Sequence, residues 1–127
     1  MKYTKLLLTF IFFCLTACKT FTQKSDLLGI WESIERHQTK NVMTFYQDSL
    51  IVDGFSGDFH TNSEWSMDST KIYLKNVRLK DTILKKELIY QYGLNSSKDT
   101  LLIEYETEKG ENSVRFKKVE KNPFKIK

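Results

Sequence analysis

The chain has 127 residues, of which 40% are hydrophobic, and its 20 basic and 16 acidic side chains give a net charge of +4. Hydrophobic residues dominate positions 1–17, and the segment 18–127 carries 18 basic against 16 acidic side chains. A segment of this length builds one hydrophobic core, which excludes a multidomain enzyme, and its small charge excess excludes the strongly basic surface of a nucleic-acid-binding protein.

The segment 1–17 has the layout of a secretory leader. Lys2 and Lys5 precede an apolar run over residues 6–15, in which Thr9 is the one polar residue. As a helix this run is ~15 Å long, half the thickness of the hydrocarbon core of a bilayer. It is too short to span a membrane, and we expect residues 1–17 to be a signal peptide.

The leader ends in Leu15-Thr16-Ala17-Cys18, which resembles the lipobox of bacterial lipoproteins. The resemblance implies that the chain is cleaved before Cys18 and that Cys18 carries three acyl chains, enough for stable membrane anchoring. The alternative is an ordinary signal peptide in which Cys18 is incidental. Residues 18–26 are expected to form a short polar tether that keeps the folded domain near the bilayer.

The same resemblance implies an address in the cell envelope. Lys19 follows the lipid site, whereas sorting in many Gram-negative bacteria holds back lipoproteins with aspartate at that position, so we expect a lipid-anchored outer-membrane protein. No acidic run of the kind that marks surface-exposed lipoproteins follows, which favours the periplasmic face. Cys14 leaves with the leader and Cys18 is lipidated, so packing alone must stabilise the domain, without a disulfide.

The segment after the leader has the composition of a β-sheet protein. Ala17 is the only alanine of the chain, whereas the β-branched and aromatic residues Val, Ile, Thr, Tyr, Phe and Trp are abundant from Cys18 onward. Turn-forming residues recur every eight to twelve positions, which is typical of an all-β domain. The expected strands cover residues 28–36, 42–47, 50–52, 58–66, 71–79, 84–94, 100–105 and 113–119.

The short connections between these strands fix the expected topology. They leave no room for the helical crossovers that parallel strands require, so the strands are antiparallel. Eight sequential antiparallel strands in one small domain predict an up-and-down β-barrel, which removes the edges of the sheet by closing it. We expect the barrel over residues 27–119 and a basic C-terminal tail over residues 120–127.

A series of short motifs resembles those of the small lipocalin-like lipoproteins of Gram-negative envelopes. Gly29 and Trp31 match the Gly-x-Trp that opens the first strand of that family. The later landmarks are Thr44-Phe45, Trp65, Lys71-Ile72-Tyr73-Leu74, Tyr90, Asp99-Thr100-Leu101 and Arg115-Phe116-Lys117-Lys118. The resemblance implies an eight-stranded lipocalin-like barrel in which Gly29 lets the chain bend at the bottom and Trp31 closes it. A basic residue of the last strand, Arg115 or Lys117, then packs over the Trp31 ring.

Two functions follow from this barrel and both stay open. Lipocalins hold a small apolar or amphipathic molecule, and the inward rings expected to contact it here are Phe45, Trp65, Tyr90 and Tyr92. The alternative is a structural, protein-interaction or inhibitor module, whose barrel is filled by its own side chains and whose surface meets another envelope protein. An eight-stranded barrel suits either function, and an interior volume of ~300 Å³ or more favours a ligand.

Residues that carry catalytic or metal chemistry are sparse. His37 and His60 are the two histidines, and Asp58 shares a strand face with His60, but no third metal ligand has suitable spacing. Residues 54–57, Gly-Phe-Ser-Gly, are one residue short of a nucleophile elbow. The chain also lacks a glycine-rich phosphate loop and a cysteine pair for zinc. We therefore expect a protein that is not an enzyme and that binds no metal, cofactor or nucleic acid.

Two patterns of charged residues have a structural interpretation. Glu104 and Glu106 precede Arg115 and Lys117, and on one face of an antiparallel hairpin we expect them to form cross-strand ion pairs worth ~0.2 to 1 kcal/mol each. Four Asp-Ser or Asp-Thr pairs resemble acceptors for O-glycosylation in some bacterial phyla, but their placement at turns is explained by turn chemistry alone. These pairs begin at Asp48, Asp68, Asp81 and Asp99.

The lipid anchor gives a direct test. Because the lipid attaches to the thiol of Cys18, Cys18→Ala should abolish metabolic labelling of the protein with palmitate and leave an uncleaved precursor. Cys14→Ala is the control and should leave labelling unchanged, since that residue departs with the leader. Cleavage and release of the Cys18→Ala protein at the normal rate would contradict the lipoprotein assignment.

Overall fold

The computed structural model describes residues 22–34, 40–54, 59–107 and 110–125. Cys18, His37 and Asp58 lie outside these ranges, together with the expected leader, so the predictions that concern them stay predictions. The elements are α2 (Lys24–Leu27), β1 (Gly29–Ser33), β2 (Asn41–Phe45), β3 (Ser49–Gly54), β4 (Phe59–Met67), β5 (Lys71–Leu79), β6 (Thr82–Leu84), β7 (Leu88–Leu94), β8 (Thr100–Thr107), β9 (Gly110–Val119) and the 3₁₀ helix η2 (Pro123–Lys125).

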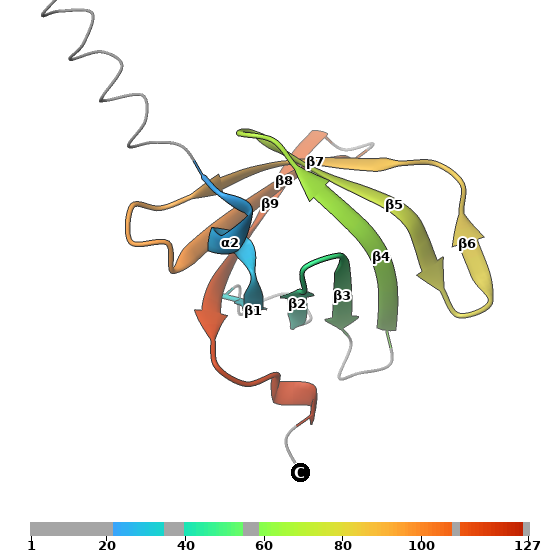
Figure 1. The fold of residues 1–127 in the computed structure, drawn as a ribbon, viewed down its shortest axis with the longest axis horizontal. Helices are drawn as coiled ribbons and strands as arrows, with labels where there is room; N and C mark the ends of the chain where they lie inside the picture. Colours follow the sequence, from blue (N-terminus) through green and yellow to red (C-terminus); the bar gives the residue numbers. More distant parts are fainter. Residues whose placement is uncertain (1–21, 35–39, 55–58, 108–109, 126–127) are drawn as a thin grey trace, which may run out of the picture.

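Eight antiparallel strands close into a barrel (Figure 1). The order around the ring is β1, β2, β3, β4, β5, β7, β8 and β9, and β9 pairs again with β1. Strands that follow one another in the chain are therefore neighbours in space, with one exception. β6 pairs with β5 outside the ring, and β7 pairs with β5 rather than with β6. The predicted all-β class and the eight-stranded up-and-down barrel are confirmed.

The expected strand over residues 84–94 is wrong in one respect, because it is interrupted between β6 and β7. The first part of β5 pairs with β7, whereas its last part pairs with β6. Between these two parts the β4–β5 register shifts, and Asn76 has a φ of +52°, a left-handed conformation that asparagine tolerates well. Such a bulge bends a strand, and here it coincides with the point where β5 changes its partner from β7 to β6.

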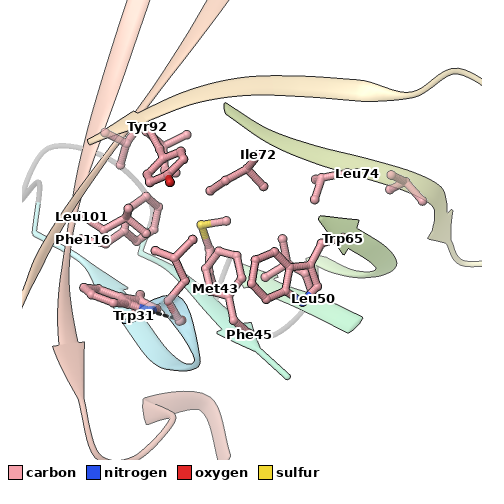
Figure 2. Close-up of a cluster of buried hydrophobic side chains, with 14 residues drawn as sticks. Trp31, Met43, Phe45, Leu50, Trp65, Ile72, Leu74, Tyr92, Leu101 and Phe116 are labelled. Atoms are coloured by element: carbon pink, nitrogen blue, oxygen red, sulfur yellow. Dashed lines mark hydrogen bonds between the residues drawn. The ribbon is translucent and has the colours of Figure 1, made fainter. Parts of the chain in front are cut away.

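Alternate residues of each strand point into the barrel. Fourteen buried hydrophobic residues form one cluster, and Figure 2 shows how their side chains from different strands point toward one another. The largest rings, Trp31, Phe45 and Trp65, gather at the end of the barrel where β1 begins and β2 and β4 end. We call this the closed end, and the opposite end, where β3 and β5 finish, the cavity end.

Trp31 is buried at the closed end of the barrel. Its side chain is fully buried, and its Nε1 donates a hydrogen bond of 2.9 Å to the carbonyl oxygen of Leu27. Leu27 is also fully buried and ends the short helix α2. Because the indole nitrogen has its partner inside the protein, the ring is buried without an unsatisfied polar group.

The basic residue over this ring is Lys118, which corrects the prediction of Arg115 or Lys117. The Nζ of Lys118 lies 5.5 Å from the centre of the Trp31 ring, and the two residues are directly opposed in the β1–β9 ladder. Phe116 is buried in the barrel, and side chains alternate along a strand, so Lys118 shares its face while Arg115 and Lys117 face outward.

Gly29 explains how the lysine reaches the ring. Its φ is +128°, and a Cβ at this position would lie 3.1 Å from Cε of Lys118. Glycine is therefore favoured by the backbone conformation, and a Cβ here would also crowd the lysine stem.

Glu104, Glu106, Arg115 and Lys117 share the outer face of the β8–β9 hairpin as expected, but the acidic residues do not directly oppose the basic ones. Glu104 is opposite Ser113, and Glu106 is opposite Glu111 rather than a basic residue. Arg115 and Lys117 are opposite Leu102 and Thr100 instead. The hairpin pairs up to Thr107 and Gly110, a shorter connection than the residues 106–112 assumed from the sequence, so the expected partners are not directly opposite one another.

The turn between β4 and β5 has the chemistry expected of an aspartate. Asp68 Oδ1 accepts hydrogen bonds from the backbone N–H groups of Thr70 (2.9 Å) and Lys71 (2.7 Å), and Oδ2 accepts one from the Tyr73 hydroxyl (2.5 Å). The bond from Tyr73, followed by those from the backbone, lowers the pKa of Asp68 to about 2. The turn explanation of the Asp-Ser pair is therefore confirmed at this position.

The chain after β9 returns to the side of the barrel. Asn122 is buried, and its Nδ2 donates to Oδ2 of Asp53 on β3 (3.2 Å). The other oxygen of the same carboxylate lies 2.7 Å from Nδ1 of His60 on β4. Residues 120–125 of the predicted tail are thus attached at Asn122.

Removal of the Trp31 ring should test the closed end. Trp31→Ala deletes a fully buried ring and its hydrogen bond, so we expect the free energy of unfolding in urea to fall by about 3 to 5 kcal/mol. Tyr46→Ala is a matched control, because that ring is 48% exposed, and should change stability by less than about 0.5 kcal/mol. Equal losses in the two variants would contradict the role of Trp31.

Candidate functional site

An apolar cavity of about 470 Å³ occupies the cavity end of the barrel. Its walls come from β2 to β9, without a contribution from β1. The lining residues are Asn41, Met43, Val52, Phe59, Thr61, Leu74, Val77, Leu79, Leu84, Leu88, Tyr90, Ile103, Tyr105, Val114 and Phe116. The volume lies within the range of small-molecule sites, ~300 to 1,000 Å³.

The size of the inward side chains explains why the cavity lies at this end. The interior of an eight-stranded barrel is just wide enough to be filled by side chains. At the closed end the inward positions hold two tryptophans and Phe45, which fill it. At the cavity end Val52, Thr61 and Val114 occupy inward positions, and these smaller residues leave the centre unfilled.

The lining carries few polar atoms and, among the residues described, no charged group. The polar atoms belong to Asn41, Thr61, Tyr90 and Tyr105. Burial raises the pKa of the Tyr90 hydroxyl, so Tyr90 is neutral near pH 7 and has a proton to donate. The cavity therefore suits an apolar chain or ring, with hydroxyl and amide groups at its wall as hydrogen-bonding partners.

Of the four rings expected to contact a ligand, Tyr90 lines the cavity. Phe45 and Trp65 instead pack edge to face, with ring centres 4.8 Å apart and an angle of 71°, and Trp65 Nε1 donates to the Tyr46 carbonyl oxygen (2.7 Å). Tyr92 donates from its hydroxyl to the carbonyl oxygen of Asp68 (2.8 Å). These three rings are not among the lining residues of the cavity and belong to the packed core.

Tyr105 and Val114 line the cavity but were not assigned to it from the sequence. Tyr105 continues the alternation of Leu101 and Ile103 along β8, and this pattern does indicate an inward side chain. Period two identifies the face of a strand, but the depth of a residue along the barrel axis depends on the register with its neighbours. The sequence therefore could not show that Tyr90 and Tyr105 line the cavity whereas Tyr92 does not.

A seam in the barrel wall adjoins the cavity. The β7–β8 ladder extends from Leu94↔Leu101 to Gln91↔Glu104 and stops there. Beyond it, the first residues of β7 pair with β5, and the last residues of β8 pair with β9, but the two strands do not pair with each other. A groove of about 540 Å³ lies at this seam and shares Leu88, Tyr90 and Tyr105 with the cavity.

The other residues singled out from the sequence do not assemble into a reactive site. The exposed His60 ring lies against the buried carboxylate of Asp53. Within the described ranges, no three histidine, cysteine, aspartate or glutamate residues come together as metal ligands. Residues 55–57 of the Gly-Phe-Ser-Gly run lie outside those ranges. No helix in the described part of the chain is long and apolar enough to cross a membrane.

Comparison with known proteins found no relatives. No protein-family model matches the chain, no curated protein matches its sequence, and no solved structure matches its fold.

The packing of Trp65 predicts that it tolerates substitution poorly. Trp65→Phe leaves the Tyr46 carbonyl without its indole partner and opens a space beside Phe45, so we expect a loss of about 1 to 3 kcal/mol of unfolding free energy. Tyr90→Phe, which removes one hydroxyl from the cavity wall, should cost less than about 1 kcal/mol. Urea denaturation measures both, and the reverse order would place Trp65 at the cavity instead.

Proposed function

We propose that this protein is a lipid-anchored envelope protein whose barrel binds one small apolar or amphipathic molecule, without catalysing a reaction on it. The observation that carries the binding function is the cavity of about 470 Å³ at the cavity end. A barrel that served only as a scaffold would gain stability by filling this space, since an empty cavity forfeits the dispersion contacts of its walls. An interior of this size therefore favours a ligand over a side-chain-filled interaction module.

The proposed orientation follows from where the chain enters the barrel. The last residues of the tether belong to α2, and α2 ends at the fully buried Leu27 beside Trp31 at the closed end. Between Cys18 and Thr22 there are four peptide steps, which span at most ~14 Å. An anchor on Cys18 would hold the closed end near the outer membrane and leave the cavity end accessible from the periplasm.

Two further interactions attach α2 to the barrel and support this arrangement. Lys98, in the β7–β8 turn, lies 3.1 Å from Asp26 of α2, and the Nζ of Lys24 lies 5.0 Å from the centre of the Trp65 ring. Asp26 also accepts a hydrogen bond from the Gln23 backbone N–H (2.9 Å), which is the main reason that its pKa is lowered. A force on the tether would therefore act on the closed end of the barrel rather than on the walls of the cavity.

Filling the cavity tests the binding function. In the full-length chain, Val77→Phe combined with Val114→Phe adds two rings to the walls, whereas Val119→Phe places the same ring on β9 outside the cavity lining. The wild-type protein, purified from membranes, should retain a small molecule detectable by native mass spectrometry. The double variant should lose it while its melting temperature is maintained, and Val119→Phe should keep it.

Contact with added amphiphiles provides a second measurement for a weakly held ligand. A photoactivatable alkyl probe added to membranes should label cavity-lining peptides of the wild type and not of the double variant. If the wild type neither retains a small molecule nor reacts with the probe inside the barrel, the proposed binding function is wrong.

A further inference from the structure

The seam between β7 and β8 lies between the cavity and a groove on the outer surface of the barrel. Leu88, Tyr90 and Tyr105 line both the interior cavity and the outer groove, so these two spaces share one wall. Neither strand depends on the missing pairs, because β7 is held by four pairs with β5 and β8 by eight pairs with β9. A ligand could therefore part β7 and β8 at the seam without breaking the pairs that hold either strand.

The seam groove changes from apolar to charged on the way out. Its inner wall consists of the three shared residues, and Ile89, which is 55% exposed, adds apolar surface on the outer side. Its outer rim carries four carboxylates and two ammonium groups: Glu87, Glu104, Glu106 and Glu111 with Lys71 and Lys86. This gradient suits a molecule with an apolar tail inside and a polar head at the rim.

The charges at the rim decide which head group is favoured. The groove has a net charge of −2, and Glu106 is directly opposite Glu111 in the β8–β9 ladder, a like-charge pair that destabilises the hairpin. Three ion pairs, Lys40–Glu32, His60–Asp53 and Lys98–Asp26, lie away from the rim. An anionic head would add to this repulsion, whereas a cationic head would relieve it.

From this geometry we infer that the ligand is a single-chain amphiphile with a cationic head group. Its tail passes through the β7–β8 seam into the cavity, and its head stays at Glu104, Glu106 and Glu111. This inference rests on the proposed binding function and adds to it the chemical class and the orientation of the ligand. A fatty acid of the same chain length is the ligand that it rejects.

Two chain-matched photoactivatable probes test the inference on the full-length protein in membranes. One is a dodecylamine and the other a dodecanoic acid, and each carries a diazirine near the end of its tail. We expect the amine to label cavity-lining peptides about tenfold more strongly than the acid, as two to three exposed charge contacts would provide. An amine probe with the diazirine beside the nitrogen should label residues 104–111 instead.

Charge variants provide the controls. Glu104→Gln combined with Glu106→Gln and Glu111→Gln should remove the preference for the amine, while labelling by the acid stays equal or rises. These side chains are exposed, so the amide replacements should leave the fold intact. Asp48→Asn combined with Asp81→Asn and Glu120→Gln removes the same charge outside the groove lining and should keep the preference.

The outcomes separate this inference from the function on which it rests. Equal labelling of the cavity by both probes, or an unchanged preference in the Glu104, Glu106 and Glu111 variant, overturns the cationic ligand and leaves the binding function standing. Labelling by the head-end probe at Asn41 and Phe59 rather than at residues 104–111 overturns the lateral route. If neither probe labels the interior of the barrel, the cationic amphiphile is wrong, and if the purified protein also retains no small molecule, the binding function itself fails.

Discussion

Closure of eight strands into a ring fixes the space that the inward side chains have to fill. The strands alternate, so half of the residues of each strand face the interior, and their volumes decide whether the barrel is solid or hollow at each level. At the closed end Trp31, Phe45 and Trp65 fill the space, and both indole N–H groups find carbonyl partners in the chain segments beside them. At the cavity end valine, threonine and leucine residues leave about 470 Å³. The packed closed end and the cavity end thus both follow from the fixed width of the closed barrel.

The sequence was sufficient for the parts of the fold that depend on local chemistry. Alternating apolar residues, frequent turn residues and short connections predicted an antiparallel barrel, and the strands lie close to the expected ranges. Gly29 and Trp31 were also identified, because a motif of three residues reflects a local requirement for a bend and a large ring. Lys118 was missed, although the buried Phe116 two residues before it determines its face. In that case the information was present in the sequence.

Other features depend on pairing between residues that are distant in the chain, and they could not be predicted from the sequence. Tyr90 and Tyr92 are two residues apart on the same face of β7, yet Tyr90 lies at the cavity and Tyr92 in the core. The register of β7 with β5 and β8 determines this difference in depth. The opposition of Glu106 and Glu111 depends in the same way on where the β8–β9 hairpin turns. The change of partner along β5 requires a bulge at Asn76, whose side chain donates to Glu64 on β4 across the same irregularity. Neither residue type alone indicates a bulge.

The seam reflects how β7 divides its pairing, with β5 over its first four residues and with β8 over its last four. β5 pairs with β6 through its last three residues and with β7 through its first four, whereas Lys75 and Asn76 pair with neither of them, and β7 begins at Leu88. The β7–β8 ladder then covers four residue pairs, half the length of the β8–β9 ladder. Backbone groups left unpaired at the seam need water or a ligand as partners, since buried and unsatisfied groups are costly. The seam thus lies beside the half of β7 that pairs with β5, with apolar walls inside and carboxylates outside.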